Sequence, residues 1–119
     1  MSVPKIFESE YRFCLILWEH QPINSTKLAA LCKEQLGWSK ATTYTVIRRL
    51  AERGVLKNEN ATVSALVTKE QVQQSEVKEM VERTFEGSLP AFIAAFCSCG
   101  KLTEEESKHL AELIESYRE

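Results

Sequence analysis

Residues 38–54 constrain the fold more than any other stretch of this 119-residue chain. Ser39 stands where a helix N-cap belongs, and Gly54 stands where a helix ends in a left-handed turn. Between these two residues, apolar side chains recur at helical spacing. The pattern therefore predicts one helix, and its inner side consists of Thr43, Val46, Ile47 and Leu50.

The outer side of this helix carries hydroxyls, guanidinium groups and one aromatic ring: Ala41, Thr42, Tyr44, Thr45, Arg48, Arg49 and Glu52. Threonine can hydrogen-bond a phosphate or a base edge, and arginine can form two hydrogen bonds to guanine. Such a face suits the groove of a nucleic acid. The alternative is an ordinary amphipathic surface helix, and the flanking segments help to decide between the two.

Two helices are predicted before this segment. Residues 8–20 carry an apolar stripe at helical spacing, and Gln21-Pro22 ends that helix because a residue before proline avoids helical angles. Ile23 is a candidate strand residue, and Asn24-Ser25 caps a second helix over residues 26–36. Two helices joined by a tight turn, the second polar on its outer face, are typical of a helix-turn-helix.

The pattern changes after Gly54. Residues 55–57 and 63–67 are β-prone, and the segment between them contains asparagines, which tolerate positive φ in turns. A hairpin directly after the second helix of a helix-turn-helix is a wing. Residues 1–68 are therefore predicted to form a winged helix-turn-helix domain within a mainly α fold.

Residues 69–119 are predicted to form three further helices. Thr68 and Gln71 make a capping box for a long helix, and Gly87-Ser88 ends it. Pro90 fits the first turn of a short apolar helix, and Thr103 caps the last helix.

This region carries more apolar surface than so short a segment encloses by itself. We expect it to dimerise by closing on a second copy around a two-fold axis. The alternative is packing against the winged domain in a monomer. The predicted interface residues are Val77, Met80, Val81, Leu89, Phe92, Ile93, Phe96, Leu110, Leu113, Ile114 and Tyr117.

The net charge of −2 is unevenly distributed. Through Thr68, nine cationic and six acidic side chains give +3, whereas six cations and eleven glutamates give −5 from Lys69 onward. A basic first part suits a polyanionic partner, and an acidic second part does not. The predicted DNA-binding residues are Lys40, Ala41, Thr42, Tyr44, Thr45, Arg48, Arg49, Lys57, Asn58 and Asn60.

Several other classes of protein find little support. No apolar run approaches the roughly 18–20 residues that span a bilayer, and the N-terminus lacks a signal-peptide pattern. We therefore expect a cytoplasmic protein with free thiols, of which Cys14 and Cys32 lie in the core. The chain has no aspartate, two distant histidines and no glycine-rich phosphate loop, so neither an enzyme nor a cofactor is expected.

Cys97 and Cys99 form the one candidate metal site in the sequence. Soft metals such as Cu(I) and Zn(II) bind thiolates, but two thiolates leave the four-ligand set of zinc incomplete. Two small residues at a helix end are the simpler interpretation, and we expect no metal.

Three short motifs, in order and at matching spacing, resemble the penicillinase-repressor (BlaI/MecI/CopY) family of bacterial winged-helix regulators. They are Ser9-Glu10 with Leu17-Trp18, residues 42–46 with Arg49-Leu50 and Gly54, and Gly87-Ser88-Leu89. The resemblance covers nearly the whole chain. It implies a homodimeric transcriptional repressor that binds a palindromic DNA operator through its winged domain. It also implies release by proteolysis in the C-terminal region or, in a copper-responsive branch, by metal binding to C-terminal cysteines.

The chain departs from this family pattern in three places. Family wings are often basic, whereas Asn58, Glu59 and Asn60 leave Lys57 as the cation of this wing. The copper branch has two Cys-x-Cys pairs, whereas this chain has one, and Ala95-Phe96 stands where the β-lactam branch is cut between asparagine and phenylalanine. A copper- or zinc-responsive repressor and a winged-helix module that docks proteins are thus the alternatives. The charge distribution and the Thr/Arg face favour DNA.

Overall fold

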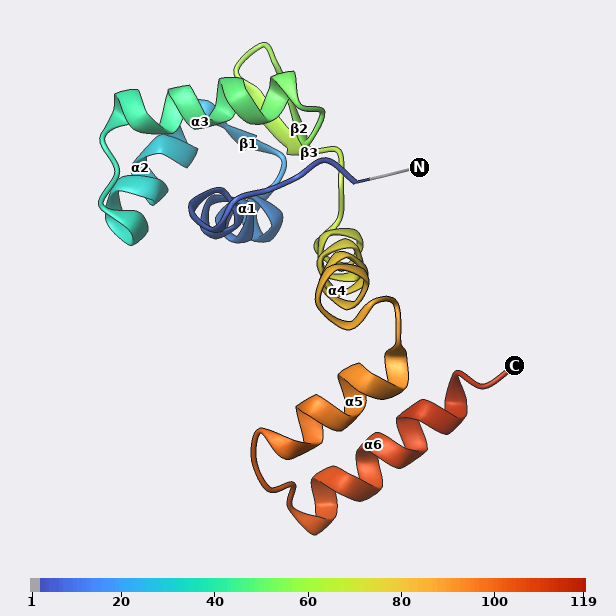
Figure 1. The fold of residues 1–119 in the computed structure, drawn as a ribbon. Coiled ribbons are helices and arrows are strands. Elements are labelled where there is room, and N and C mark those ends of the chain that lie inside the picture. Colours follow the sequence, from blue (N-terminus) through green and yellow to red (C-terminus); the bar gives the residue numbers. More distant parts are fainter. Residues whose placement is uncertain (1–2) are drawn as a thin grey trace. The chain divides into compact units, whose positions relative to one another are not determined.

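The computed structural model describes residues 3–119, and the mainly α fold predicted from the sequence is confirmed (Figure 1). The elements are α1 (Glu8–His20), β1 (Ile23–Asn24), α2 (Ser25–Leu36), α3 (Lys40–Glu52), β2 (Leu56–Glu59), β3 (Thr62–Ala65), α4 (Lys69–Phe85), α5 (Leu89–Ser98) and α6 (Glu104–Ser116). They divide into two compact units, one through Val77 and the other from Lys78 to Glu119. Residues 1–2, with which the predicted first domain begins, lie outside the described part.

The helices begin and end at the signals found in the sequence. The Asn24 side chain accepts a hydrogen bond from the Thr26 N–H at 2.8 Å, and the Ser39 hydroxyl accepts one from the Thr42 N–H at 3.1 Å. Each bond satisfies an amide that has no partner inside its helix. Gly37 ends α2 at a φ of 72°, a left-handed conformation that glycine adopts without a steric cost.

The wing is part of a three-stranded antiparallel sheet in the order β1-β3-β2. Ile23 pairs with Val63, so the short strand before α2 extends the β2–β3 hairpin. The Ser25 N–H also donates to the Ala61 carbonyl at 2.8 Å. These bonds join the tip of the wing to the start of α2.

One hydrophobic core holds the first unit together. Fully buried side chains come from all three helices and from the hairpin: Phe13, Cys14, Leu17, Leu28, Cys32, Ile47, Leu50, Val55, Leu56 and Val63. Cys14 and Cys32 are therefore core residues, as predicted. The Phe13 ring also stacks on Trp38, with the ring centroids 6.1 Å apart.

The first turns of α4 belong to this unit. Val72 is 2% exposed and packs in the same core. Just before α4, the Trp18 indole N–H donates to the Val67 carbonyl at 2.9 Å. The Val67 carbonyl therefore bonds a side chain of α1. Strand β3 ends at Ala65, two residues earlier than the sequence pattern suggested. The first compact unit ends at Val77.

An ion pair between a buried carboxylate and a half-buried guanidinium links the end of α3 to the start of α1. Glu10 is 8% exposed, and its carboxylate pairs with the Arg53 guanidinium. The same carboxylate accepts a hydrogen bond from the Phe7 N–H at 2.9 Å, and Arg53 donates to the Lys5 carbonyl at 3.0 Å. These partners replace the hydrogen bonds to water that the Glu10 carboxylate loses on burial.

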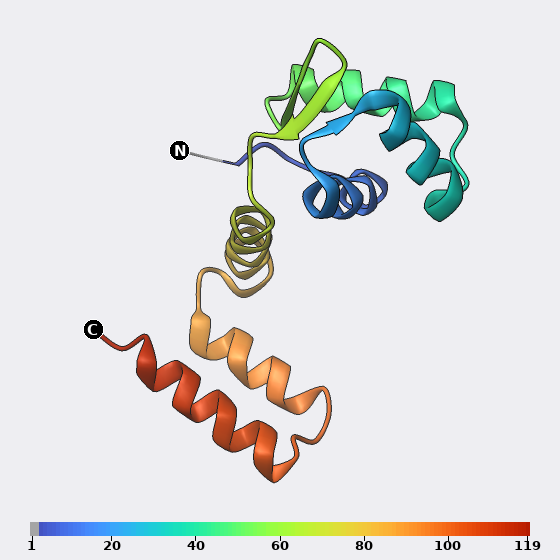
Figure 2. The same ribbon diagram turned by 180° about the vertical axis from the view of Figure 1, so that it is seen from behind.

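The second unit contains the end of α4 together with α5 and α6. Figures 1 and 2 show α5 and α6 side by side and running in opposite directions. The Phe85 and Phe92 rings meet edge to face at 5.6 Å, and Val81 is buried. Among the described residues of α5 and α6, by contrast, none is fully buried. This unit thus leaves much of its apolar surface exposed.

Replacing Arg53 by alanine should destabilise the first unit. The Glu10 carboxylate would keep its buried position but lose its charged partner, so we expect the free energy of unfolding to fall by about 2–3 kcal/mol. Arg12→Ala is the matched control, because its ion pair with Glu8 is exposed and contributes less than about 1 kcal/mol. Urea unfolding of both variants measures the difference. Equal losses would contradict a structural role for the buried pair.

The four cysteines should fall into two reactivity classes. Burial, and to a lesser degree the nearby Glu10 carboxylate, raises the pKa of Cys14 to about 12, and burial also raises the pKa of Cys32. At pH 8, four units below that value, about one Cys14 thiol in ten thousand is the reactive thiolate. Cys97 and Cys99 are exposed.

An aromatic disulfide reagent at pH 8 should therefore modify two thiols rapidly and the other two only after denaturation. The variant carrying Cys97→Ser and Cys99→Ser serves as the control and should show no rapid phase. Three or four rapid equivalents in the parent would show that the core thiols are accessible.

Candidate nucleic-acid interface

Helix α3 has two chemically different sides, as the sequence pattern predicts. Thr43, Ile47 and Leu50 are at most 2% exposed and hold the helix on the core. Predicted site residues that are exposed on this helix are Lys40, Ala41, Thr42, Arg48 and Arg49. Two guanidinium groups are thus presented to solvent on a helix whose inner side is fixed by packing.

The first turn of α3 presents an oriented hydroxyl. The Ser39 hydroxyl donates to Thr42 Oγ1 at 2.9 Å while it accepts from the Thr42 N–H. The exposed Thr42 hydroxyl can also hydrogen-bond a partner in solvent. Lys40 Nζ lies 5.8 Å from the centroid of the Tyr44 ring, which holds an ammonium group beside the same turn.

Tyr44 and Thr45 are less exposed to solvent than the sequence pattern suggested. Both are half-buried, and the Tyr44 ring packs against the core. The hydroxyls of Ser25 and Thr26 lie beside the Tyr44 phenol and lower its pKa. Tyr44 therefore joins α3 to the start of α2, a contact that helical periodicity alone does not reveal because both partners lie on another helix.

One buried polar group stands out on the inner side of α3. No hydrogen-bond partner of good geometry is found for Thr43 Oγ1 among the described residues. Its polar neighbour is the Cys32 thiol, whose pKa the Thr43 hydroxyl lowers against the larger effect of burial. A thiol is a weak donor and acceptor, so this contact satisfies the hydroxyl poorly.

The wing places its predicted residues at the surface. Lys57, Asn58 and Asn60 are exposed, and Asn60 and Ala61 form a tight turn at φ values of 52° and 63°. Lys57 Nζ lies 3.9 Å from a carboxylate oxygen of Glu59. This pairing was absent from the sequence prediction, although the two-residue spacing on a strand could have suggested it.

The two groups of predicted DNA-binding residues lie on neighbouring elements. Helix α3 packs against β2 within the first unit. Figures 1 and 2 both show the β2–β3 turn at the same end of this unit as α3. Helix α3 and the wing are therefore neighbouring elements of the first unit.

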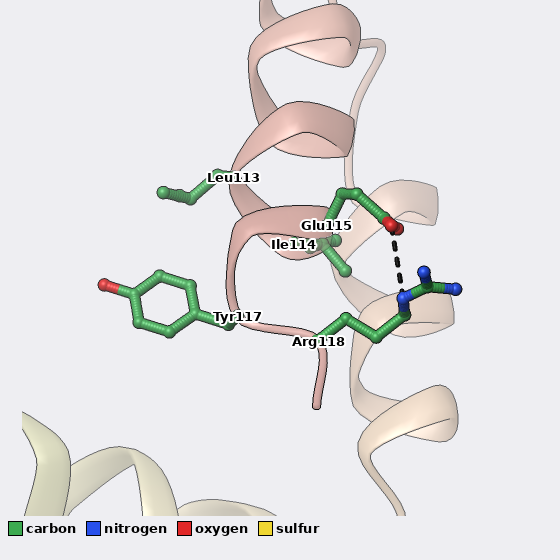
Figure 3. A pocket seen from close by; sticks show the side chains of 5 residues that line it. All are labelled: Leu113, Ile114, Glu115, Tyr117 and Arg118. Atoms are coloured by element: carbon green, nitrogen blue, oxygen red, sulfur yellow. Dashed lines mark ion pairs between the residues drawn. The ribbon is translucent and has the colours of Figure 1, made fainter.

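The predicted dimerisation residues differ in exposure. Val77, Leu89, Ile93, Phe96, Leu113, Ile114 and Tyr117 are exposed, Met80, Phe92 and Leu110 are half-buried, and Val81 is buried in its own chain. At the end of α6, the residues Leu113, Ile114, Glu115, Tyr117 and Arg118 line a hollow of about 480 Å³. Figure 3 shows Leu113 and Tyr117 projecting from one side of the helix and the ion pair of Glu115 with Arg118 on the other.

The candidate metal residues do not join a larger cluster. Cys97 lies near the end of α5 and Cys99 caps it, and both are exposed. Within residues 3–119, no group of three or more His, Cys, Asp or Glu side chains is arranged to hold a metal ion. In the same part of the chain, no helix is long and apolar enough to cross a membrane.

Comparison with known proteins identifies the family of this chain. The penicillinase repressor of Bacillus licheniformis is 23% identical over 122 residues, which cover 98% of this chain and 94% of that protein. A solution structure of monomeric BlaI from the same organism, in complex with the blaP half-operator, has a similar fold. Its TM-score is 0.52 at 22% identity, over 59% of this chain and 90% of that one. The family model of the penicillinase repressor matches residues 6–116, and the chain therefore belongs to the penicillinase repressor family.

Proposed function

We propose that this chain is a DNA-binding transcriptional repressor that acts as a homodimer on a palindromic operator. The observation that carries the proposal is the outer face of α3, where Arg48, Arg49 and Thr42 are exposed on a helix held rigidly by the core. Membership in the penicillinase repressor family supports it. A similar fold in BlaI, whose structure contains a half-operator, gives further support.

In this proposal α3 enters the major groove. Guanidinium groups bind guanine edges with two hydrogen bonds or bind phosphates, and both modes are open to Arg48 and Arg49. The Thr42 hydroxyl can donate a hydrogen bond to a phosphate, and Lys40 adds a cation near the same turn. The half-buried Tyr44 and Thr45 then support and border the reading face.

The proposed dimer uses the apolar surface of the second unit. Exposed side chains such as Leu113, Ile114 and Ile93 would be removed from water by a second copy, a gain of about 25 cal/mol per Å² of apolar area. A two-fold dimer presents two copies of α3, and this arrangement matches a palindrome. Each half-site then raises the effective concentration of the other.

The direct test selects duplexes from a random pool with the full-length protein and assays the DNA beside its own gene by gel shift. We expect an inverted repeat whose half-sites are centred about 10 bp apart or at a multiple of that distance. A protein that selects no duplex, yet captures a protein through its first unit, would instead be a docking module.

Arg48→Ala and Arg49→Ala should each weaken binding to the selected duplex. Loss of a base-reading contact costs about 1–3 kcal/mol and relaxes specificity at one position. Arg12→Ala removes the same charge from the exposed side of α1 and should change affinity little. Titrations on the selected duplex and on single-base variants measure both quantities. If both arginine variants behave like Arg12→Ala, α3 is not the reading helix.

Leu113→Asp should dissociate the proposed dimer. Leu113 is exposed in the single chain, so the substitution leaves the protomer intact but places an unpaired carboxylate in the interface. Ala111→Asp adds the same charge at an exposed α6 position outside the predicted set and is the control. Sedimentation velocity should give a monomer for the first variant and a dimer for the second. A dimer in both cases would place the interface elsewhere.

A further inference from the structure

We propose that Glu59 limits the affinity of this protein for DNA by competing with phosphate for Lys57. The inference rests on the proposed function, in which the wing lies near the DNA backbone. It makes Glu59 an affinity-determining residue of the wing, whose role is to weaken a contact rather than to form one.

The carboxylate is positioned by the alternation of β2. Leu56 is buried, and successive strand residues point to opposite faces, so Lys57 and Glu59 share the face opposite Leu56. Lys57 Nζ lies 3.9 Å from Glu59 Oε1, with 49% and 71% of the two side chains exposed. Within residues 55–65, Lys57 is the only cation and Glu59 the only acid.

This pair lies on a well-fixed part of the wing. Glu59 pairs with Thr62 across the hairpin, next to the turn formed by Asn60 and Ala61. The Ala61 carbonyl accepts a hydrogen bond from the Ser25 N–H at 2.8 Å, so the turn is tied to the start of α2. The strand that carries Lys57 and Glu59 is thus held next to α3.

An exposed ion pair contributes little to folding, so Glu59 has little structural value here. Its effect on a polyanionic ligand is larger. A lysine that binds phosphate releases a counterion and makes the negative slope of log K against log salt steeper by about 0.9. Lys57 must leave Glu59 to do so, and the remaining carboxylate then repels the same phosphate.

The test compares Glu59→Gln with Glu19→Gln in the full-length chain. Both substitutions remove one negative charge, but Glu19 is an exposed residue of α1. The probe is the duplex selected by the parent protein, titrated between 50 and 200 mM salt. For Glu59→Gln we expect about three- to tenfold tighter binding at about 50 mM salt and a slope steeper by up to about 0.9 per half-site. Glu19→Gln should match the parent.

A third variant carries Lys57→Ala together with Glu59→Gln, and it should lose the added slope. The proposal is overturned if Glu59→Gln binds like Glu19→Gln, or if the third variant keeps the whole gain. A failure of the proposed function looks different, because the parent protein then selects no duplex at all.

Discussion

The ion pair of Glu10 with Arg53 joins the end of α3 to the start of α1. Arg53 ends α3, and its guanidinium bonds both the Glu10 carboxylate and the Lys5 carbonyl, so the last turn of α3 is held against the segment that starts α1. At the other end, Trp38 stacks on Phe13 of α1 just before the first turn of α3. These contacts at both ends, together with the buried Thr43, Ile47 and Leu50, define which side of α3 faces outward.

The polar contacts around α3 are directional, whereas the apolar contacts of the core are not. Ile47, Leu50 and their neighbours would tolerate small rotations of α3, because apolar contacts are not directional. The carboxylate of Glu10 tolerates only the arrangement in which Arg53 and the Phe7 amide reach it. In this fold the polar contacts therefore add directional constraints to the packing of the apolar core.

Local rules were sufficient to predict the helices and their ends. Caps at Asn24, Ser39 and Thr103 involve residues close in sequence, so their chemistry can be recognised without a structure. The reading-face residues Arg48 and Arg49 also followed from helical spacing.

Contacts between distant residues could not be predicted in this way. Arg53 and Glu10 are 43 residues apart, and Trp18 and Val67 are 49 apart. The phenol of Tyr44 meets hydroxyls of another helix, so a position assigned to the outer face is half-buried. The exposed apolar surface of the second unit, by contrast, could be predicted, because the excess of apolar residues is visible in the sequence itself.

Helix α4 is continuous in sequence, yet its two ends belong to different units. Val72 is fixed in the core of the first unit, and Val81 is buried in the second. We therefore expect the bonded amide protons near Val72 to exchange with solvent mainly when the winged unit opens, and those near Val81 mainly when the second unit opens. The two ends of α4 thus have different local stabilities. A partner that binds one unit should slow amide exchange most at the end of α4 that belongs to that unit.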